Sequence, residues 1–399
     1  MHNLAEALSL MGHRVYAIDY ANRWTKNGIF DFGNLKTTEI TSASRAIDKS
    51  SVYLKRPGFI KIPGVSRFSA AFTHYFEISK TIREKNIDVI VLYSVATNGL
   101  QTIHLAKKHG IPVVFRSIDI LHRLVRYPIL RPATKLLEKK VYSNADVILA
   151  ITPNHARYVI SMGAPPSRVK LLLLPIDTNI FHQSSECSEL RHKWGLEDID
   201  QIIIFIGTLF DFSGLDEFIR EFPKIVEQIP KAKLLIVGDG PQRPKLKQII
   251  AELGLEKQVI MTGLQPYSTM PQYISLATVC INPFLNVEST RDIFPGKIIQ
   301  YLACGKATVA TPLLGITALL PIGSNGIIYA DSAEEMAKEV VNLLKSSPKR
   351  HSLEQVGLDY VNQTHVQQKI ARQLEKELID IIATKRSKFD NLVENKENN

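Results

Sequence analysis

A glycine-rich turn marks the passage from a strand to a helix in the second half of the chain. Val237-Gly238-Asp239-Gly240-Pro241 comes after an apolar run typical of a buried strand and precedes a helical stretch. Glycine permits a tight turn, and proline suits the first position of a helix. Taken alone, the pattern indicates a well-formed turn at least as readily as a ligand site. Its meaning therefore depends on the segments further along the chain.

A candidate phosphate site lies nearer the C-terminus. Phe294-Pro295-Gly296-Lys297 directly precedes a predicted helix that carries Gln300. The first amides of a helix lack partners within the helix, and the helix dipole favours an anion, so a diphosphate could bind there. Lys297 adds a full positive charge, and Arg291 stands nearby in the sequence. The alternative is a loop followed by a helix with a lysine on its surface.

Composition narrows the class of protein. Of the 399 residues, 45% are hydrophobic and 22% are charged, which is ordinary for a folded chain and argues against disordered and collagen-like classes. The length fits two α/β domains. A net charge of +10 favours an anionic partner, namely nucleic acid, a phosphorylated ligand or an acidic membrane surface. Nucleic acid ranks last, because no helix-turn-helix or aromatic-plus-basic sheet motif is recognisable.

Cysteines and apolar runs predict location and redox state. Cys187, Cys280 and Cys304 lack the intervals of zinc sites or disulfide frameworks, so we expect reduced, buried thiols and no metal. The apolar runs are too short to span a bilayer, and the first residues do not resemble a secretory signal. We therefore expect a cytoplasmic protein, including one bound peripherally to the inner face of the plasma membrane.

Short β-branched runs alternate with longer amphipathic stretches, which is typical of parallel sheets covered by helices. In the first half, strands are predicted at 14–19, 88–93, 112–116, 146–151 and 169–174. In the second half, strands are predicted at 201–206, 232–237, 258–262, 278–283, 307–310 and 326–329. The predicted domains are residues 1–178 and 201–365, joined by a polar linker at 179–200 and followed by a helix at 366–384 and a disordered tail at 385–399.

The start of the chain is unusual for such a fold. Helical spacing is shown by Leu4, Ala5, Leu8 and Met11. This predicted helix ends at Gly12, before the first predicted strand. A doubly wound sheet usually begins with a central strand and a glycine-rich turn that approaches a phosphate, and this sequence shows neither. We expect that the codons upstream of Met1 encode them, because of a late-assigned start or a fragment; a genuine loss is the alternative.

Several segments, in order, resemble the retaining family 4 (group 1) glycosyltransferases. The turn at 238–241, the run 253–255 and the strand end 259–263 are similar to that family's turn, helix and strand end. The run 301–310 looks like its "YLACGKPVVA" segment, with Ala307 in place of proline. Residues 3–15 and 145–181 resemble parts of its N-terminal domain.

The resemblance implies an α/β fold of the GT-B type, with two Rossmann-like domains facing a central cleft. It also implies transfer of a sugar from a nucleotide diphosphate sugar, bound by the second domain, to a hydroxyl of a glycan or lipid-linked acceptor, bound by the first. Such a reaction needs no cofactor and no metal, and cell-surface glycan biosynthesis is the expected setting. Catalysis would depend on positioning the substrates and stabilising the departing diphosphate.

The family's donor motifs map onto this chain with departures. Its two glutamates, seven residues apart, correspond to Asp292 beside the transferred sugar and Gln300 on the nucleotide ribose. An arginine and a lysine that contact the diphosphate correspond to Thr208 and Ser213, so more of the phosphate charge rests on Lys297. The donor-binding candidates are Gly207, Thr208, Ser213, Gly238, Arg291, Phe294, Pro295, Gly296 and Gln300. The alternative for Asp292 and Gln300 is a place on the solvated surface.

In the first domain, the resemblance makes Asp119 a further catalytic candidate beside Asp292 and Lys297, and it makes His122 a candidate contact to sugar or acceptor. A structural role is the alternative for both. The stretch 122–140 interleaves Arg and Lys with leucines, which suits an anionic membrane or a lipid phosphate; a solvated helix face is the other interpretation. The departures also leave open a truncated or degenerate, noncatalytic relative that binds nucleotide sugar or acts as a partner subunit.

Overall fold

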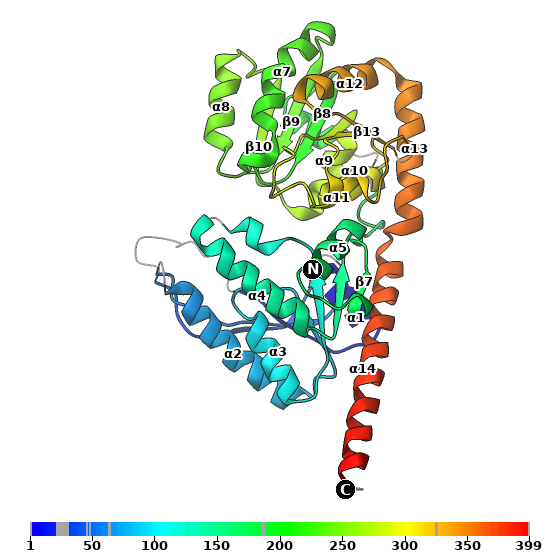
Figure 1. The fold of residues 1–399 in the computed structure, drawn as a ribbon. Coiled ribbons are helices and arrows are strands. Elements are labelled where there is room, and N and C mark those ends of the chain that lie inside the picture. Colours follow the sequence, from blue (N-terminus) through cyan, green and yellow to red (C-terminus); the bar gives the residue numbers. More distant parts are fainter. Residues whose placement is uncertain are drawn as a thin grey trace. The chain divides into compact units, whose positions relative to one another are not determined.

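The chain folds into two compact units in the computed structural model, which describes residues 2–20, 32–44, 47, 49–62, 65–125, 127–184, 188–323 and 326–397 (Figure 1). Unit 1 combines Met1–Pro175 with Gln367–Asn399, and unit 2 is Ile176–Val366. Each unit is an α/β assembly with parallel strands. All eleven predicted strands are present, with ends that differ by up to three residues.

The main sheet of unit 1 is parallel, with the order β4-β5-β6-β7. Its strands are β4 (Ile90–Leu92), β5 (Val113–Ser117), β6 (Val147–Ala150) and β7 (Val169–Leu171). The residues of β5 and β6 are all buried, which explains the apolar sequence of β6 and of the first three residues of β5. The helices that alternate with these strands are α2 (Ser66–Lys85), α3 (Gly99–Lys108), α4 (Arg131–Asn144) and α5 (Pro153–Ser161).

A second, three-stranded sheet comes after the opening helix α1 (His2–Leu10), whose presence confirms the predicted helical start. The strand order is β1-β3-β2, from β1 (Val15–Ile18), β3 (Val52–Arg56) and β2 (Thr38–Ala43). The sequence did not predict β2, because five of its six residues are exposed and show no apolar alternation, nor β3, which is short and ends in Lys55 and Arg56. Ile18 of β1 packs into the same core cluster as Leu92 of β4.

The chain returns to unit 1 through α14 (Gln367–Glu397). Leu374 and Leu378 pack with Leu4 and Leu8 of α1 in one core cluster. Of the segment 385–399, predicted as a disordered tail, the described residues continue α14 as far as Glu397. The segment contains no glycine or proline to end the helix, and its start is anchored by a 2.7 Å ion pair between Lys385 and Asp146.

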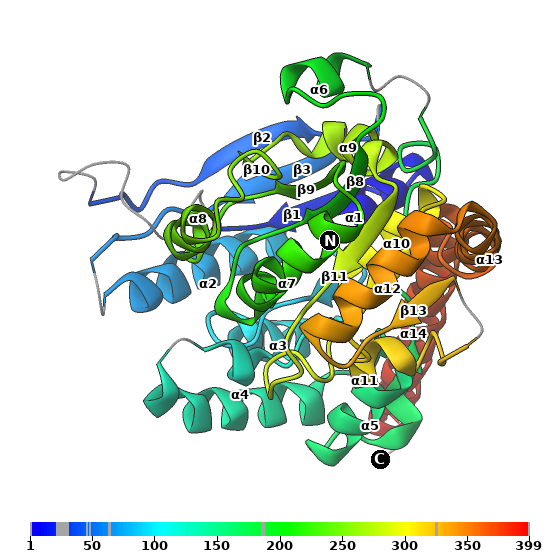
Figure 2. The ribbon, with the colours of Figure 1, turned by 90° about the horizontal axis from the view of Figure 1, so that it is seen from above.

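Unit 2 contains a six-stranded parallel sheet with the order β10-β9-β8-β11-β12-β13. The strands are β8 (Gln201–Ile206), β9 (Ala232–Val237), β10 (Val259–Gly263), β11 (Val279–Asn282), β12 (Thr308–Ala310) and β13 (Ile327–Tyr329). The principal helices are α7 (Leu215–Gln228), α8 (Arg243–Glu252), α9 (Met270–Leu276), α10 (Gly296–Ala303), α12 (Ala333–Lys345) and α13 (Ser347–Thr364), seen from above in Figure 2.

The residues predicted as an interdomain linker, 179–200, belong to unit 2. They form the short helix α6 (Ser188–Lys193), and the Trp194 indole donates a hydrogen bond to the Tyr273 hydroxyl at 3.0 Å. The prediction missed this packing because the segment is polar and a six-residue helix leaves little periodicity to detect. The units meet in sequence at Pro175–Ile176 and Val366–Gln367 instead.

The predicted buried, reduced thiols are confirmed for Cys280 and Cys304, whereas Cys187 lies outside the described residues. Burial raises the pKa of Cys304 to about 12, so this thiol stays protonated and inert at neutral pH. Within the described ranges, no helix is both long and apolar enough to cross a bilayer. No cluster of three or more potential metal ligands was found among the same residues.

Candidate active site

The strand order of unit 2 indicates where a ligand should bind. When the six strands are numbered in chain order with β8 as strand 1, their order across the sheet is 3-2-1-4-5-6, which is the order of dinucleotide-binding folds. In such sheets, ligands bind beyond the carboxyl ends of the strands, where the order reverses. That point lies between β8 and β11, which pair in parallel through Val279 and Ile203. The residues directly after Ile206 and Asn282 are therefore candidates for ligand contacts.

Two glycines bring the loops after β8 and β9 together. Gly207 has a φ of +143° and Gly238 a φ of +145°, a backbone conformation that favours glycine. A Cβ atom on Gly238 would lie 1.9 Å from the Gly207 carbonyl oxygen. The Leu209 amide also donates to the Asp239 carbonyl at 3.1 Å. The glycine-rich turn therefore packs against the loop after β8 and holds it in place, in addition to any contact that it makes with a ligand.

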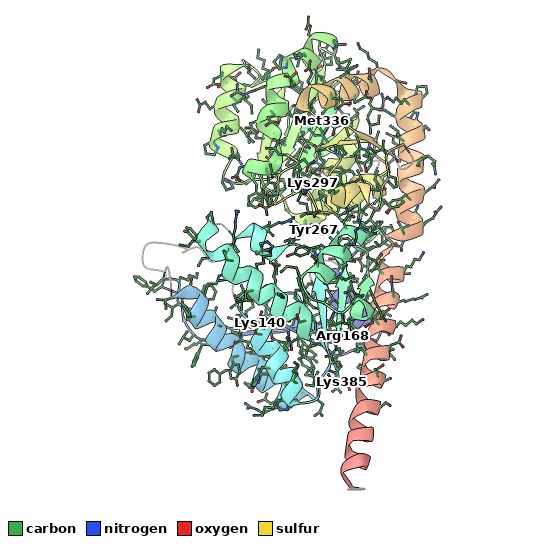
Figure 3. All side chains as sticks on the ribbon, viewed as in Figure 1. Lys140, Arg168, Tyr267, Lys297, Met336 and Lys385 are labelled. Atoms are coloured by element: carbon green, nitrogen blue, oxygen red, sulfur yellow. The ribbon has the colours of Figure 1, made fainter. Side chains whose placement is uncertain are left out.

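Lys297, labelled in Figure 3, stands on the first turn of α10, and the end of its side chain lies beside Gly207 in the loop after β8. Its ammonium nitrogen lies 3.7 Å from the centre of the Phe205 ring and 4.3 Å from that of Phe284. A Cβ atom on Gly207 would approach this nitrogen to 2.9 Å. Part of the side chain is exposed, but the ammonium itself is enclosed and has no hydrogen-bond partner in the described structure. Burial lowers the pKa of Lys297 well below its ordinary range.

The helix that carries Lys297 is fixed to the sheet by Tyr301. The Tyr301 hydroxyl accepts a hydrogen bond from the Ile206 amide at 2.9 Å, immediately before Gly207. Tyr301 is fully buried, and burial raises the pKa of its hydroxyl, so it remains neutral. This hydrogen bond fixes the position of α10 relative to the loop after β8. It explains physically why the segment at 301–310 matters for the site.

The other donor candidates of α10 and the loop before it lie within a few residues of Lys297. Phe294 and Pro295 are buried, Gly296 is exposed, and Gln300 is half-buried one turn after Lys297. The Asp292 carboxylate lies 3.9 Å from the Arg291 guanidinium, and the Asp292 side chain is largely buried. The loop between β11 and Asp292 is shaped by the buried hydroxyl of Thr290, to which the Val287 amide donates at 3.1 Å.

The two positions where the family carries basic residues differ in environment. Thr208 is exposed directly after Gly207, whereas Ser213 is buried in a short 3-10 turn and its amide donates to the Phe210 carbonyl at 3.0 Å. Neither provides a positive charge. Among the donor candidates of unit 2, Lys297 and Arg291 are therefore the cations available to a diphosphate.

In unit 1, the candidates come after β5. Asp119 is half-buried, and burial raises the pKa of its carboxyl group. His122 is buried and held by Glu138, with 2.5 Å between its Nδ1 and the carboxylate oxygen. Arg116, at the end of β5, donates hydrogen bonds to the carbonyls of Leu149 and Leu173. His122 and Arg116 thus have demonstrable structural partners, while Asp119 retains a carboxyl group near the strand end.

Sequence reasoning missed three residues of the site. Phe205 and Phe284 enclose the Lys297 ammonium, and no feature of the sequence sets either apart from ordinary core residues. Asn282, two residues before Phe284, is fully buried, and both polar atoms of its amide lack a partner among the described residues. An asparagine at the end of an otherwise apolar strand was the available signal, because such a residue is costly to bury unpaired.

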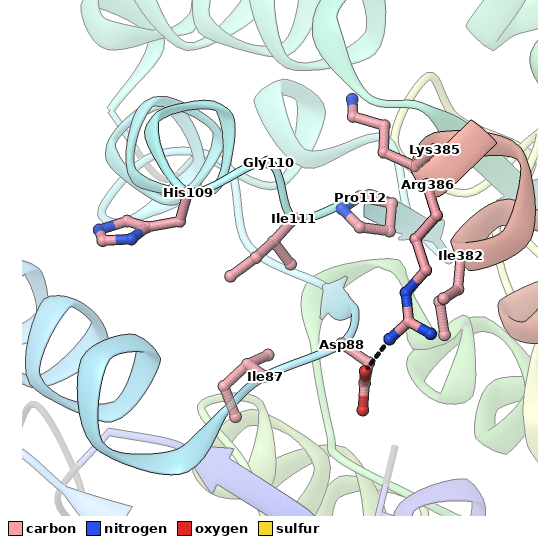
Figure 4. Close-up of a pocket in the computed structure, with 9 residues that line it drawn as sticks. All are labelled: Ile87, Asp88, His109, Gly110, Ile111, Pro112, Ile382, Lys385 and Arg386. Carbon is pink, nitrogen blue, oxygen red and sulfur yellow. Dashed lines mark hydrogen bonds and ion pairs between the residues drawn. The ribbon is translucent and has the colours of Figure 1, made fainter. Parts of the chain in front are cut away.

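Unit 1 also contains a pocket that includes none of the candidate site residues (Figure 4). It is lined by Ile87, Asp88, His109, Gly110, Ile111, Pro112, Ile382, Lys385 and Arg386. These residues precede β4 and β5 or belong to α14, so the pocket lies at the amino ends of the strands. Arg386 is bound there by Asp88 at 2.8 Å. The pocket therefore lies where α14 packs on unit 1, at the end of the sheet opposite to the one that carries Asp119.

Two family models match this chain. The model described as "Glycosyl transferases group 1" matches residues 200–346, and the one described as "Glycosyl transferase 4-like domain" matches residues 1–174. The first contains every donor candidate of unit 2, and the second contains Asp119 and His122. Both halves of the chain are thus covered by models of one kind of enzyme.

Individual relatives are distant. The chain is similar to N-acetyl-alpha-D-glucosaminyl L-malate synthase of Bacillus anthracis, with 20% identity over 77% of this chain and 78% of the relative. It is also similar to alpha-monoglucosyldiacylglycerol synthase of Acholeplasma laidlawii, with 21% identity over 86% and 82% of the two chains. Among solved structures, HepE of Anabaena, in complex with UDP and glucose, aligns with a TM-score of 0.64 and 19% identity over 76% of this chain and 80% of that one.

Proposed function

The chain belongs to the group 1 glycosyl transferases and has their GT-B fold, and from this premise we propose its reaction. It moves a sugar, with retention of anomeric configuration, from a nucleotide diphosphate sugar to a hydroxyl of a glycan or lipid-linked acceptor. The reaction uses no cofactor. Unit 2 binds the donor and unit 1 binds the acceptor.

The enclosed ammonium of Lys297 is the observation that carries this proposal. A buried ammonium without a hydrogen-bond partner is unfavourable, and an anion beside it would remove that cost. Lys297 stands on the first turn of α10, whose amide groups and dipole favour the same anion. The ammonium also lies at the switch point of a sheet with nucleotide-binding order. A diphosphate satisfies all three features.

Lys297 would act on the leaving group. The bond between the anomeric carbon and the diphosphate oxygen breaks, and negative charge accumulates on the diphosphate. A positive charge held in a site shielded from water stabilises that charge strongly without reorganising. The acceptor oxygen forms the new bond to the anomeric carbon, and its proton passes to the departing diphosphate oxygen. Asp292 contacts the transferred sugar, Gln300 binds the ribose hydroxyls, and Asp119 and His122 contact the sugar or acceptor from unit 1.

The donor and acceptor classes are inferred from relatives. Anabaena HepE is described in complex with UDP and glucose, which supports a uridine nucleotide as the first donor to test. The name of the Acholeplasma relative specifies a glycosylated diacylglycerol as product, which supports a lipid-linked acceptor. The segment 122–140 fits an enzyme at the inner face of a membrane, because Ile129 is 87% exposed and Lys135, Lys139 and Lys140 are exposed on the helix that follows it.

Thermal unfolding in the presence of UDP, GDP, ADP and their sugar conjugates tests the donor site, since a ligand that binds only the folded state raises its apparent stability. We expect one nucleotide to stabilise the protein and Lys297→Ala to abolish that effect. Lys245→Ala is the matched control, because Lys245 is an exposed lysine of unit 2 paired with Asp216 at 2.7 Å. An unchanged response in Lys297→Ala would contradict the assignment.

Turnover separates the enzyme from a noncatalytic relative. Release of nucleotide diphosphate is measured with the stabilising donor and a mixture of lipid acceptors. Acceptor-dependent release that Asp292→Asn lowers at least tenfold would support the proposed reaction. Nucleotide binding without turnover toward any acceptor would favour the noncatalytic alternative.

A further inference from the structure

Helix α2 of unit 1 has its polar and aromatic faces reversed relative to an ordinary surface helix. Beside the apolar Ala70, Ile78 and Ile82, the face that packs on unit 1 buries the polar side chains of Glu77, Thr81 and the fully buried His74. Glu77 forms a 2.6 Å ion pair with Lys55 of β3, and Thr81 accepts a hydrogen bond from the same ammonium at 3.3 Å. A surface helix normally turns its apolar stripe toward the core. Here a large part of the buried face is polar.

The outward face of α2 is aromatic. Phe68, Phe72 and Phe76 succeed one another at four-residue spacing and are 80%, 60% and 54% exposed. Tyr75 adds to this face, with its ring 5.6 Å from that of Phe76, and Phe72 packs edge-on against Phe76 at 4.7 Å. Four exposed aromatic side chains on one helix exceed the scattered apolar residues of an ordinary soluble surface, and such a patch marks an interaction site.

The same stripe becomes basic toward the end of the helix. Lys80 comes after Phe76 at the same spacing, and Arg83 and Lys85 stand in the last turn; all three are exposed. Glu84 is the exposed acidic residue of this stretch, so the end of α2 carries a net positive charge. The whole chain has a net charge of +10. The surface therefore combines aromatic rings with cations.

We propose that the aromatic face of α2 lies in the surface of an anionic lipid bilayer. Phe68, Phe72 and Phe76 insert between the headgroups, Tyr75 lies at the polar boundary, and Lys80 and Arg83 contact lipid phosphates. An amphipathic helix with aromatic residues on one side and Lys or Arg beside them binds membranes in this way. This inference rests on the proposed function in one respect, because a lipid-linked acceptor would be presented at that surface.

Charge decides between a bilayer and a second copy of this chain. Two copies meeting through α2 would bring the basic ends of both helices, on chains of net charge +10, into one interface. Like charges that approach each other oppose association, whereas an anionic membrane attracts them. Helix α3 contacts both α2 and α4, so the proposed surface belongs to the same helical layer as the exposed segment that precedes α4.

Vesicle sedimentation with the whole chain tests the proposal. The probes are vesicles of phosphatidylcholine alone and of phosphatidylcholine mixed with phosphatidylglycerol. We expect stronger binding to the anionic vesicles, and a loss of about a hundredfold when Phe68, Phe72 and Phe76 are all changed to serine. Lys80→Gln with Arg83→Gln should weaken binding about thirtyfold on anionic vesicles and leave binding to neutral vesicles unchanged.

The matched control changes equally exposed apolar residues of unit 2. Leu264→Ser with Ile322→Ser, at positions 71% and 74% exposed, should leave vesicle binding unchanged. Circular dichroism verifies that each variant is folded. If the Phe68, Phe72 and Phe76 variant binds vesicles as the parent does, the proposal is overturned. The proposal is also overturned, in favour of a second copy of this chain, if the parent forms a dimer and binds no vesicles while the variant is monomeric.

Nucleotide stabilisation measured on the same preparations distinguishes the two proposals. Loss of vesicle binding with an unchanged nucleotide response in the Phe68, Phe72 and Phe76 variant supports the membrane surface and leaves the donor site intact. A parent protein that binds vesicles but no nucleotide refutes the donor site alone. A parent protein that binds nucleotide but no vesicle refutes the membrane surface alone.

Discussion

The ammonium nitrogen of Lys297 lies 3.7 Å from the centre of the Phe205 ring, enclosed and without a hydrogen-bond acceptor among the described residues. The negative face of an aromatic ring attracts a cation, which offsets part of the cost of removing the ammonium from water. A bound anion can relieve the rest of the cost of removing the ammonium from water. This relationship connects the stability of unit 2 with its affinity for an anion, and two predictions depend on it.

Lys297→Met should stabilise the empty protein while it removes the diphosphate contact. Methionine keeps the packing against the Phe205 and Phe284 rings and eliminates a desolvated charge, and such replacements are neutral or stabilising by about 1–4 kcal/mol. Urea unfolding with and without the nucleotide measures both effects. A variant that is less stable than the parent when empty, and equally stabilised by nucleotide, would show that Lys297 has a purely structural role.

The stability of the parent protein should rise with pH relative to Lys297→Met. Burial lowers the pKa of Lys297 in the folded state, so between that pKa and the ordinary value of about 10.5 the unfolded chain binds more protons. Stability therefore increases as pH rises through this window, and the difference between the two proteins narrows. Nucleotide affinity should fall over the same window, because deprotonation removes the positive charge. Unfolding and nucleotide titrations across this pH range provide the measurement, and parallel profiles for the two proteins would contradict it.

Gly238→Ala should destabilise unit 2 by about 3 kcal/mol or more, because the added Cβ atom would overlap the Gly207 carbonyl oxygen at 1.9 Å. Gly254→Ala is the control: Gly254 has a φ of +64° and open space around it, so only the backbone conformation is penalised, by about 1 kcal/mol. Urea unfolding compares the two variants. Equal losses would mean that the contact between the loops after β8 and β9 adds nothing to stability.

Gln300→Glu should increase donor affinity by about fivefold to tenfold. A carboxylate accepts hydrogen bonds from vicinal hydroxyls more strongly than an amide does, and the proposal assigns Gln300 to the ribose. Nucleotide titration of the parent, of Gln300→Glu and of Gln300→Leu measures the order of affinities. A leucine variant that binds as well as the parent would exclude a contact between Gln300 and the nucleotide.

Leu374→Ala should destabilise unit 1 by about 2–4 kcal/mol and leave nucleotide binding by unit 2 unchanged. Leu374 is buried between α14 and α1, and truncating it leaves a cavity in that cluster. Ile379→Ala, on the same helix but 53% exposed, is the control and should change stability little. Limited proteolysis of the two variants reports the opening of unit 1. A loss of nucleotide binding in Leu374→Ala would show that the units depend on each other.

The sequence predicted the sheets well wherever burial forces an apolar run. The strands from Gln201 to Val237 are buried on both faces, so their composition alone identifies them. Strand β2 could not be found, because Thr38–Ala43 is held at an edge by β3 and not by its own burial. Fold prediction thus failed where a strand depends on its neighbour.

The site was predictable in type but not in mechanism. The position of Lys297 before a helix indicated a phosphate site, yet nothing in its local sequence showed that Phe205, 92 residues earlier, encloses the ammonium. The reversed face of α2 was equally unpredictable, since its periodicity is that of any amphipathic helix. On the buried face, Glu77 pairs with Lys55 of β3, a partner that the local sequence of α2 does not reveal.

The packing of α14 on α1 has a consequence for how the protein is made. Unit 1 is assembled from both ends of the chain, whereas unit 2 is one continuous stretch. During synthesis on the ribosome, unit 2 can fold as soon as Val366 has emerged, but Leu4 and Leu8 can pack only after Leu374 and Leu378 of α14, which are translated later than unit 2, have emerged. Until then their apolar surface is open to chaperones, and a chain interrupted before α14 would contain a complete unit 2 and an incomplete unit 1.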